Sequence, residues 1–263
     1  MEQQRFVRKN TALFDAQRRQ EKKRTRRTVF YVFLFLLISA IFLTVCVAVF
    51  LKVEAVNING IEKYAYEEIA AQVPIEIGSN IYSFKSDEIE QNILNSLPYI
   101  YSVEIKRDLP TTVEVNIVEE KPYYYSQIAG DTYLISKELK VLERIVGKKT
   151  DITGLTQLKL NNVRRCIVGS TIEFVDKRTY DALIELYTAF ENSYIDEKVV
   201  GVDVRSRFDI YIDYDNRFEV YLGDIDNIDI KIRFLVGIID ELGDGTKGKI
   251  DVSNHREASV ALS

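Results

Sequence analysis

The chain has 263 residues and a net charge of −5; its first 28 residues carry +7, so the remainder carries −12. An acidic remainder argues against a nucleic-acid partner, which would require clustered Lys and Arg, and against adhesion to anionic wall polymers. One of its two cysteines, Cys46, lies in a long apolar run and the other, Cys166, lies far outside it. We therefore expect no disulfide, and a region after the run that is held together by its own core.

Residues 29–51 form a run without a charged residue. A helix over this run would be roughly 35 Å long, enough to cross a hydrocarbon core of about 30 Å. A basic block directly precedes it: Arg18, Arg19, Lys22, Lys23, Arg24, Arg26 and Arg27. Because positive charge stays on the cytoplasmic side, we expect residues 1–28 to form a cytoplasmic tail and the chain after Lys52 to lie outside. The main role expected of these basic residues is to set the membrane topology. Their attraction to anionic lipid headgroups is a consequence of their position next to the membrane.

A secretory signal peptide is the alternative interpretation of this run. Such peptides have an apolar core of about 7–15 residues and a cleavage site of small residues. The run is longer than that, and its end at residues 48–52 has no such site. An uncleaved membrane anchor is therefore favoured.

Residues 53–121 are predicted to form an α+β unit with the order β-α-α-β-β. Its expected elements are an alternating strand at 53–59, a helix at 66–73, a helix from Ser86 to Leu97, and strands around 103–106 and 113–117. Gly60, Pro74 and Pro98 end the first three of these elements, as strand- and helix-breaking residues do.

Residues 122–253 are predicted to form a second, sheet-rich domain. Its expected elements are a hairpin at 132–142, a helix at 180–190, strands at 208–214 and 218–223, a helix at 228–242 and a last strand at 248–253. The alternation places Phe208, Ile210, Ile212 and Tyr214 toward the core. Cys166 is expected to be a buried residue of a strand. Residues 254–263 are expected to be a flexible tail.

Candidate catalytic chemistry is sparse. The single histidine, His255, falls in the expected tail, and no His/Cys cluster has zinc spacing. Six acidic residues could attract a hard cation: Asp209, Asp213, Asp215, Asp224, Asp226 and Asp229. They lack the Gly and Glu of an EF-hand loop, and a solvated strand face followed by a helix N-terminus explains them. Nothing selects a carboxylate pair for glycoside hydrolysis. We predict no metal, no cofactor, no small-molecule substrate and no enzymatic activity.

Four sequence motifs carry a family resemblance: residues 57–60 (Asn-Ile-Asn-Gly), residues 78–82 (Gly-Ser-Asn-Ile-Tyr), residues 105–115 and residues 119–122. With the β-α-α-β-β order, residues 53–121 resemble a POTRA domain, and more narrowly the one in the FtsQ/DivIB family of bacterial cell-division proteins. Residues 122–253 resemble the second, beta domain of that family. The resemblance implies a transmembrane helix, a POTRA domain, and a mixed α/β domain with a largely antiparallel sheet.

The resemblance also implies a function. Proteins of this family are single-pass membrane scaffolds at the division septum, and they bind small bitopic partners of the FtsL and DivIC/FtsB types through the end of the beta domain. We expect the last strand to be the binding edge, because no later strand is expected to cover it; its residues are Lys249, Ile250, Asp251 and Val252. Tyr211 and Tyr221 on neighbouring strands are further candidates. Ile250 and Val252 can equally be core residues of that strand.

Two other functions stay open from sequence. A membrane-anchored wall enzyme would need a deep cleft with two converging carboxylates. A POTRA-bearing receptor of a secretion or assembly system would bind a channel or barrel protein.

Overall fold

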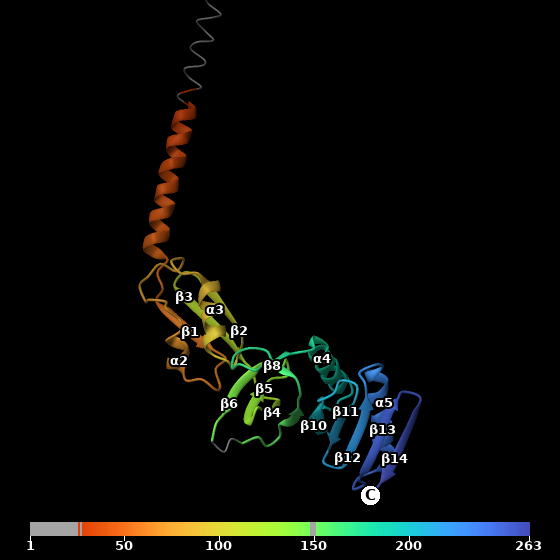
Figure 1. The fold of residues 1–263 in the computed structure, drawn as a ribbon. Helices are drawn as coiled ribbons and strands as arrows, with labels where there is room; N and C mark the ends of the chain where they lie inside the picture. The colour runs from red at the N-terminus through yellow and green to blue at the C-terminus, as the bar shows by residue number, and fades with distance from the viewer. Residues whose placement is uncertain (1–25, 27, 148–150) are drawn as a thin grey trace, which may run out of the picture. The chain divides into compact units, whose positions relative to one another are not determined.

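The computed structural model describes residue 26, residues 28–147 and residues 151–263 (Figure 1). Of the predicted basic block, Arg26 is described and exposed, while Arg18, Arg19, Lys22, Lys23, Arg24 and Arg27 lie outside the described residues. The chain divides into two compact units. Of the described residues, the first unit contains those up to residue 57 and residues 75–85 and 106–114, and the second unit contains the others. The predicted domain limits stay predictions.

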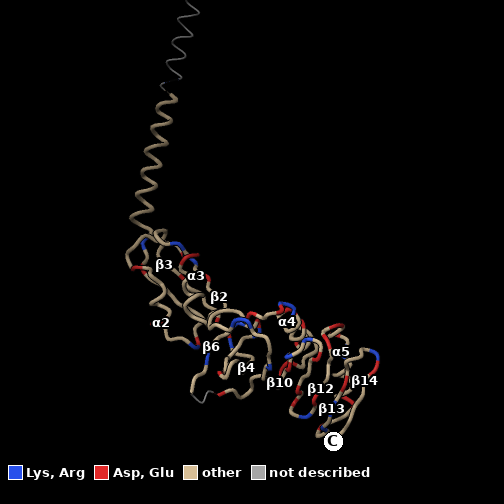
Figure 2. Tube along the Cα trace, in the orientation of Figure 1, with Lys and Arg blue, Asp and Glu red and all other residues tan. Residues whose placement is uncertain are grey.

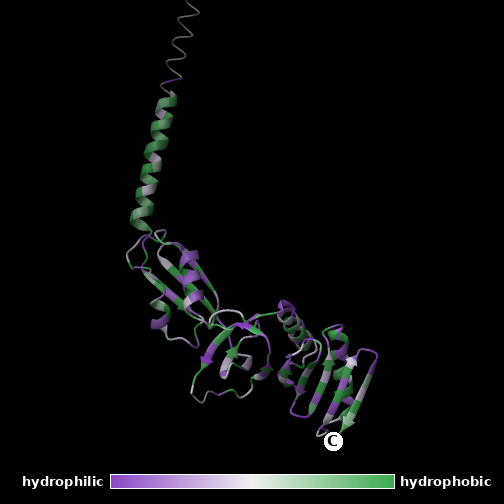
Figure 3. Ribbon diagram, viewed as in Figure 1, coloured by the Kyte–Doolittle hydropathy of each residue, from purple (hydrophilic) through white to green (hydrophobic). Residues whose placement is uncertain are grey.

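The first unit begins its described part with a long apolar helix, Thr28–Phe50, which contains an 18-residue stretch with a mean hydropathy of 3.0. Figure 3 shows its hydrophobic character along its length. Among the described residues it is the one helix long and apolar enough to cross a membrane. Its bounds lie within one residue of the predicted run.

Strands β1 (Ala55–Asn59), β2 (Ile100–Asp108) and β3 (Thr112–Glu119) form a three-stranded sheet in the order β1-β3-β2. Helices α2 (Tyr66–Ala70) and α3 (Ser86–Ser96) come between β1 and β2 in the chain, so the predicted β-α-α-β-β order is confirmed. Alternate residues of β3, Val113, Val115 and Ile117, are buried. Helix α2 is shorter than predicted, because the chain turns at Ala71 and Gln72 before Pro74.

The second unit contains a nine-stranded sheet with the order β14-β13-β12-β11-β10-β7-β4-β5-β6. Its strands are β4 (Tyr124–Ile128), β5 (Asp131–Ile135), β6 (Val141–Ile145), β7 (Thr156–Lys159), β10 (Val199–Asp203), β11 (Ile210–Tyr214), β12 (Phe218–Gly223), β13 (Gly248–Asn254) and β14 (Glu257–Leu262). Most neighbours are antiparallel, and the pairs β4–β7, β7–β10 and β12–β13 are parallel. The short strands β8 (Val163–Arg165) and β9 (Glu173–Phe174) pair with each other.

Helices α4 (Lys177–Asn192) and α5 (Ile228–Leu242) share one hydrophobic core with the nine-stranded sheet, and the 3-10 helix η1 (Asp196–Lys198) follows α4. The predicted bounds of α5 agree with the structure. Helix α4 begins three residues before its predicted start, because the Asp176 carboxylate accepts a hydrogen bond from the Arg178 backbone N–H at 3.1 Å. A side-chain cap of this kind favours helix initiation at that point.

Three local predictions are wrong. Phe208 is 59 % exposed and precedes β11, where the Arg207 guanidinium lies 3.9 Å from its ring centroid. Cys166 follows β8 rather than lying in a strand, and it is only partly buried; this burial raises the pKa of its thiol to about 11. The expected flexible tail instead contains β14, because its alternating apolar residues pair with β13.

Candidate functional site

Strand β14 forms one end of the nine-stranded sheet. It pairs antiparallel with β13, with Ile250 opposite Val260 and Gly248 opposite Leu262. Strand β13 therefore lies between β12 and β14, and the prediction that residues 249–252 form the edge is wrong. The open edge of the sheet belongs to residues 257–262.

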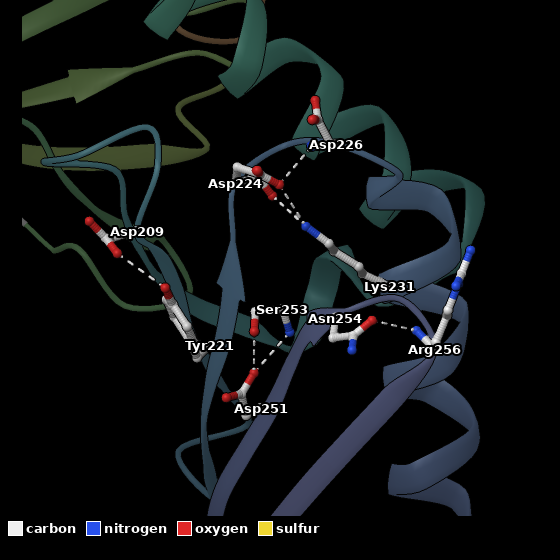
Figure 4. A network of polar contacts seen from close by, with 9 residues as sticks. All are labelled: Asp209, Tyr221, Asp224, Asp226, Lys231, Asp251, Ser253, Asn254 and Arg256. Carbon is white, nitrogen blue, oxygen red and sulfur yellow. Dashed lines mark hydrogen bonds and ion pairs between the residues drawn. The ribbon is translucent and has the colours of Figure 1, made fainter.

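A tight turn joins β13 to β14. The Arg256 backbone N–H donates to Asn254 Oδ1 at 3.1 Å, so the asparagine side chain holds the turn as an Asx-turn does. Just before it, Ser253 donates from its N–H and its hydroxyl to Asp251 Oδ1, at 2.9 and 2.7 Å (Figure 4). The register shifts between Asp251 and Asn254. Asp251 is thus engaged within the strand, at a local irregularity that leads into the turn.

A row of apolar residues crosses the sheet on its helix-covered face and ends at β14. The paired residues are, in order, Leu158, Val202, Ile212, Val220, Ile250 and Val260. The first five are each at most 2 % exposed, whereas Val260 is 40 % exposed. The next apolar residue of β14 on that face, Leu262, is 58 % exposed. The core therefore continues to the edge strand and stops there without cover among the described residues.

The backbone of β14 presents free hydrogen-bonding groups at the edge. The Ser263 N–H donates to the Lys247 carbonyl at 3.0 Å, so Ser263 points its N–H toward β13. Because backbone groups alternate in direction along a strand, the N–H and C=O groups of Val260 and Leu262 point away from β13. Such a row of unpaired groups is a template for another strand.

The opposite face of the sheet is polar, and Figure 2 shows charges of both signs along these strands. Lys249 pairs with Glu219 at 2.9 Å, and both are exposed. Tyr211 and Tyr221 lie opposite each other with ring centroids 4.7 Å apart. The Tyr221 hydroxyl donates to Asp209 Oδ1 at 3.1 Å, and this hydrogen bond raises the pKa of Tyr221.

The sequence-predicted site residues are thus split between the two faces. Lys249, Asp251, Tyr211 and Tyr221 share the polar face, where Asp251 lies opposite Tyr221. Ile250 and Val252 are at most 1 % exposed and belong to the core, as the alternation of that strand allowed. Whether any of them contacts a partner stays a prediction.

Four of the six acidic residues that could attract a cation have separate side-chain partners, and one of them, Asp209, accepts from Tyr221 as described above. Asp213 lies 3.9 Å from Lys159, and Asp215 lies 3.0 Å from Arg217. Asp224 accepts from the buried Lys231 ammonium at 2.9 Å, and this hydrogen bond lowers the pKa of Asp224 (Figure 4). The described part of the chain contains no group of three His, Cys, Asp or Glu residues suited to a metal ion.

An open hollow of about 940 Å³ includes the polar face, with Asp213, Glu219 and Lys249 among its lining residues. Each of its two strand carboxylates, on Asp213 and Glu219, faces a lysine ammonium. A third carboxylate, on Glu197 of η1, also lines the hollow.

The residues that sequence reasoning missed are Ala258, Val260 and Leu262. Their spacing of two is a strand signal, but the segment is short and its turn, His255-Arg256, contains no glycine. The Asn254 side chain supplies the turn instead. An asparagine three residues before the start of β14 was the signal that could have revealed it.

Comparison with known proteins supports a family assignment. Residues 51–120 match the family model "POTRA domain, FtsQ-type". The chain is 30 % identical over 238 residues to the cell division protein DivIB of Clostridium botulinum (strain Hall), covering 88 % of this chain and 90 % of that protein. It is 26 % identical to DivIB of Clostridium tetani, covering 83 % and 82 %. It is 24 % identical to the cell division protein FtsQ of Corynebacterium glutamicum, covering 67 % and 73 %.

Proposed function

Because the chain belongs to the FtsQ/DivIB family of cell division proteins, we propose that it is a membrane-anchored, non-enzymatic scaffold of the division septum. It binds bitopic partners of the FtsL and DivIC/FtsB types, and it does so by adding a partner strand to β14. The family resemblance suggests the partner types. The open backbone edge of β14 suggests the mode of binding.

The observation that carries the proposal is the apolar row ending at Val260. A partner strand alongside β14 would satisfy the outward N–H and C=O groups of Val260 and Leu262, which supplies affinity through main-chain hydrogen bonds. Its alternate side chains would cover Val260 and Leu262, which are 40 % and 58 % exposed. Burying this area adds roughly 25 cal/mol per Å². The edge thus offers hydrogen bonds and apolar contact to the same ligand.

The anchoring part of the proposal rests on the apolar helix Thr28–Phe50. The 27 residues before it carry +7, which favours their retention in the cytoplasm and export of the nine-stranded sheet. The partners are themselves bitopic, so anchoring in the same membrane raises the effective concentration of the edge near them.

The test replaces Val260 with proline in the full-length protein. Proline has no N–H, and at this position the lost N–H is one that points to the open edge. The pairing of β13 with β14 should survive, while binding to the external region of a DivIC-like or FtsL-like partner should weaken about tenfold or more, or at least about 1.4 kcal/mol. Isothermal titration calorimetry measures the affinity.

The matched control is Val260→Thr, which keeps the N–H and the β-branched shape and should bind with little change. Thermal unfolding of both variants tests whether the fold is retained. Unchanged affinity of a folded Val260→Pro variant would contradict strand addition at β14.

A further inference from the structure

Two loops of the first unit are fastened to the residues that directly follow the apolar helix. The Ile81 N–H donates to the Leu51 carbonyl at 2.9 Å, and Gly78 and Ser79 exchange hydrogen bonds with Val53 at 2.7 and 2.9 Å. The Glu54 N–H donates to the Thr111 carbonyl at 2.8 Å. The loop 77–84 and the turn 108–111 are therefore held at the point where the chain leaves the helix.

One side chain of these loops reaches the helix itself. Asn80 Nδ2 donates to the carbonyl of Val47 at 2.9 Å. Val47 lies three residues before the helix end at Phe50, so the loop contacts the last turn about 4.5 Å inside that end along the axis. Within the described helix, Cys46 and Val47 are the residues that are partly buried. The loop thus overlaps in depth with the end of the apolar segment.

The same loops carry large apolar side chains that are exposed. Ile77 is 64 % exposed, Tyr82 is 54 % exposed and Leu109 is 53 % exposed. Beside them the Arg107 guanidinium donates to the carbonyls of Ile81 and Phe84, both at 2.9 Å, and lies 4.6 Å from the Phe84 ring centroid. These hydrogen bonds hold the loop that carries Tyr82 in a defined shape. Large apolar side chains exposed on neighbouring loops are typical of a site of interaction.

We propose that Ile77, Tyr82 and Leu109 form a membrane-contact patch that inserts into the headgroup region of the bilayer spanned by the apolar helix. Tyrosine is typical of this region, where its ring meets lipid and its hydroxyl meets water. The proposed ligand of the patch is the lipid bilayer and not a soluble protein. The reason is that the loop 77–84 contacts the last turn of the apolar helix. The proposal rests on the membrane anchoring given above.

The absence of tryptophan from the chain makes a direct test possible. Single Trp variants of the full-length protein are placed in bilayers with acyl chains brominated near the headgroups, which quench nearby Trp emission. The probe is Tyr82→Trp, and its emission should be quenched, as for a side chain inserted in the interface. The matched control is Tyr101→Trp, because Tyr101 is 57 % exposed. It lies in β2 six residues before Arg107, about 20 Å away along the strand, and should not be quenched.

A third variant, Phe50→Trp, reports on the helix and separates the two proposals. Quenching of Phe50→Trp without quenching of Tyr82→Trp would overturn the patch and leave the anchor intact. Equal quenching of Tyr82→Trp and Tyr101→Trp would also overturn it, because the contact would not be confined to these loops. Absence of quenching at Phe50→Trp would overturn the anchor and the patch together.

Discussion

The two ends of the nine-stranded sheet differ in how their edges are protected. At the β6 end, residues 169–171 pair with the start of the strand. The Val141 N–H donates to the Ser170 carbonyl, and the Val141 carbonyl accepts from the Gly169 N–H. Lys140 forms an isolated antiparallel β-bridge with Thr171. Strand β6 also carries Glu143 and Arg144. Natural sheets protect their edges by such covering segments and charges.

Strand β14 has neither form of protection. Its sequence, Glu-Ala-Ser-Val-Ala-Leu, contains one charged residue and no Pro or Lys, and among the described residues no strand pairs with its outer side. One sheet therefore has a closed end and an end fit for pairing. This difference supports the proposal that β14 binds a partner strand.

The largest effect is expected where β14 approaches β13 most closely. A Cβ added at Gly248 would overlap the backbone carbonyl of Ala261, so neither strand could yield without shifting its main chain. We expect Gly248→Ala to lower the free energy of unfolding by about 3 kcal/mol and to separate β14 from the sheet. Chemical denaturation and hydrogen exchange of the β14 amides measure both effects.

Gly237→Ala in α5 is the matched control. A Cβ at Gly237 meets no atom within 4 Å, and Gly237 lies in the interior of the helix. The substitution should raise stability by about 0.5–1 kcal/mol. A Gly248→Ala variant as stable as the wild type would contradict the close pairing of β13 and β14.

An intermediate effect is expected near the closed edge. Lys140 Nζ lies 3.6 Å from the buried Glu120 carboxylate and donates to the Ile100 carbonyl at 2.7 Å. Lys140→Met leaves that carboxylate without its cation, and we expect a loss of about 1–2 kcal/mol at neutral pH. Burial raises the pKa of Glu120, so the folded state favours its protonated form.

The sign of the pH dependence follows from that raised pKa. The contribution of Glu120 to stability is fully present below its unfolded-state pKa and is lost as the pH rises through its folded-state pKa. The loss caused by Lys140→Met should therefore shrink in acid, and it should be smaller in a Glu120→Gln background, where only the hydrogen bond to the Ile100 carbonyl is lost. Denaturation curves across the acidic range measure this. An effect of Lys140→Met that is independent of pH would refute the role of the ion pair.

The smallest effect is expected at Lys249, which the sequence had suggested as a binding residue. Its ion pair with Glu219 is exposed to solvent, and such pairs contribute little to stability. Lys249→Ala should leave the melting temperature within error and partner affinity nearly unchanged, in contrast to Val260→Pro. If Lys249→Ala lowered the affinity as much as Val260→Pro, the partner would bind the polar face of β13, and binding at the β14 edge would be contradicted. Calorimetric titration of the two variants side by side decides this.

The sequence-based predictions succeeded where one segment carries a strong period. Helix α5 shows Ile228, Ile232, Leu235 and Ile239 at helical spacing, and its bounds agree with the structure. The alternation of Ile210, Ile212 and Tyr214 likewise places three buried residues correctly. Burial of one side of an element is a local property, and local pattern predicts it well.

Prediction failed where tertiary pairing decides the outcome. Phe208 continues the alternation of β11, yet it lies outside the strand, beside Arg207. Whether residues 257–262 form a strand depends on the partner strand β13, which a six-residue pattern cannot specify. The parallel pairing of β12 with β13 across α5 is a non-local feature of the same kind. The sequence thus predicted which side chains of these strands face the core, but it did not predict which strand forms the edge of the sheet.

The apolar row from Leu158 to Val260 has a consequence for recognising partner sequences. A one-residue slip in pairing moves every side chain to the other face of a sheet, so an added strand must place apolar residues beside Val260 and Leu262 and polar residues beside Ser259 and Ala261. This period of two residues therefore selects one register of the added strand. A partner segment whose hydrophobic residues fall out of phase would pair its backbone only by exposing them to water.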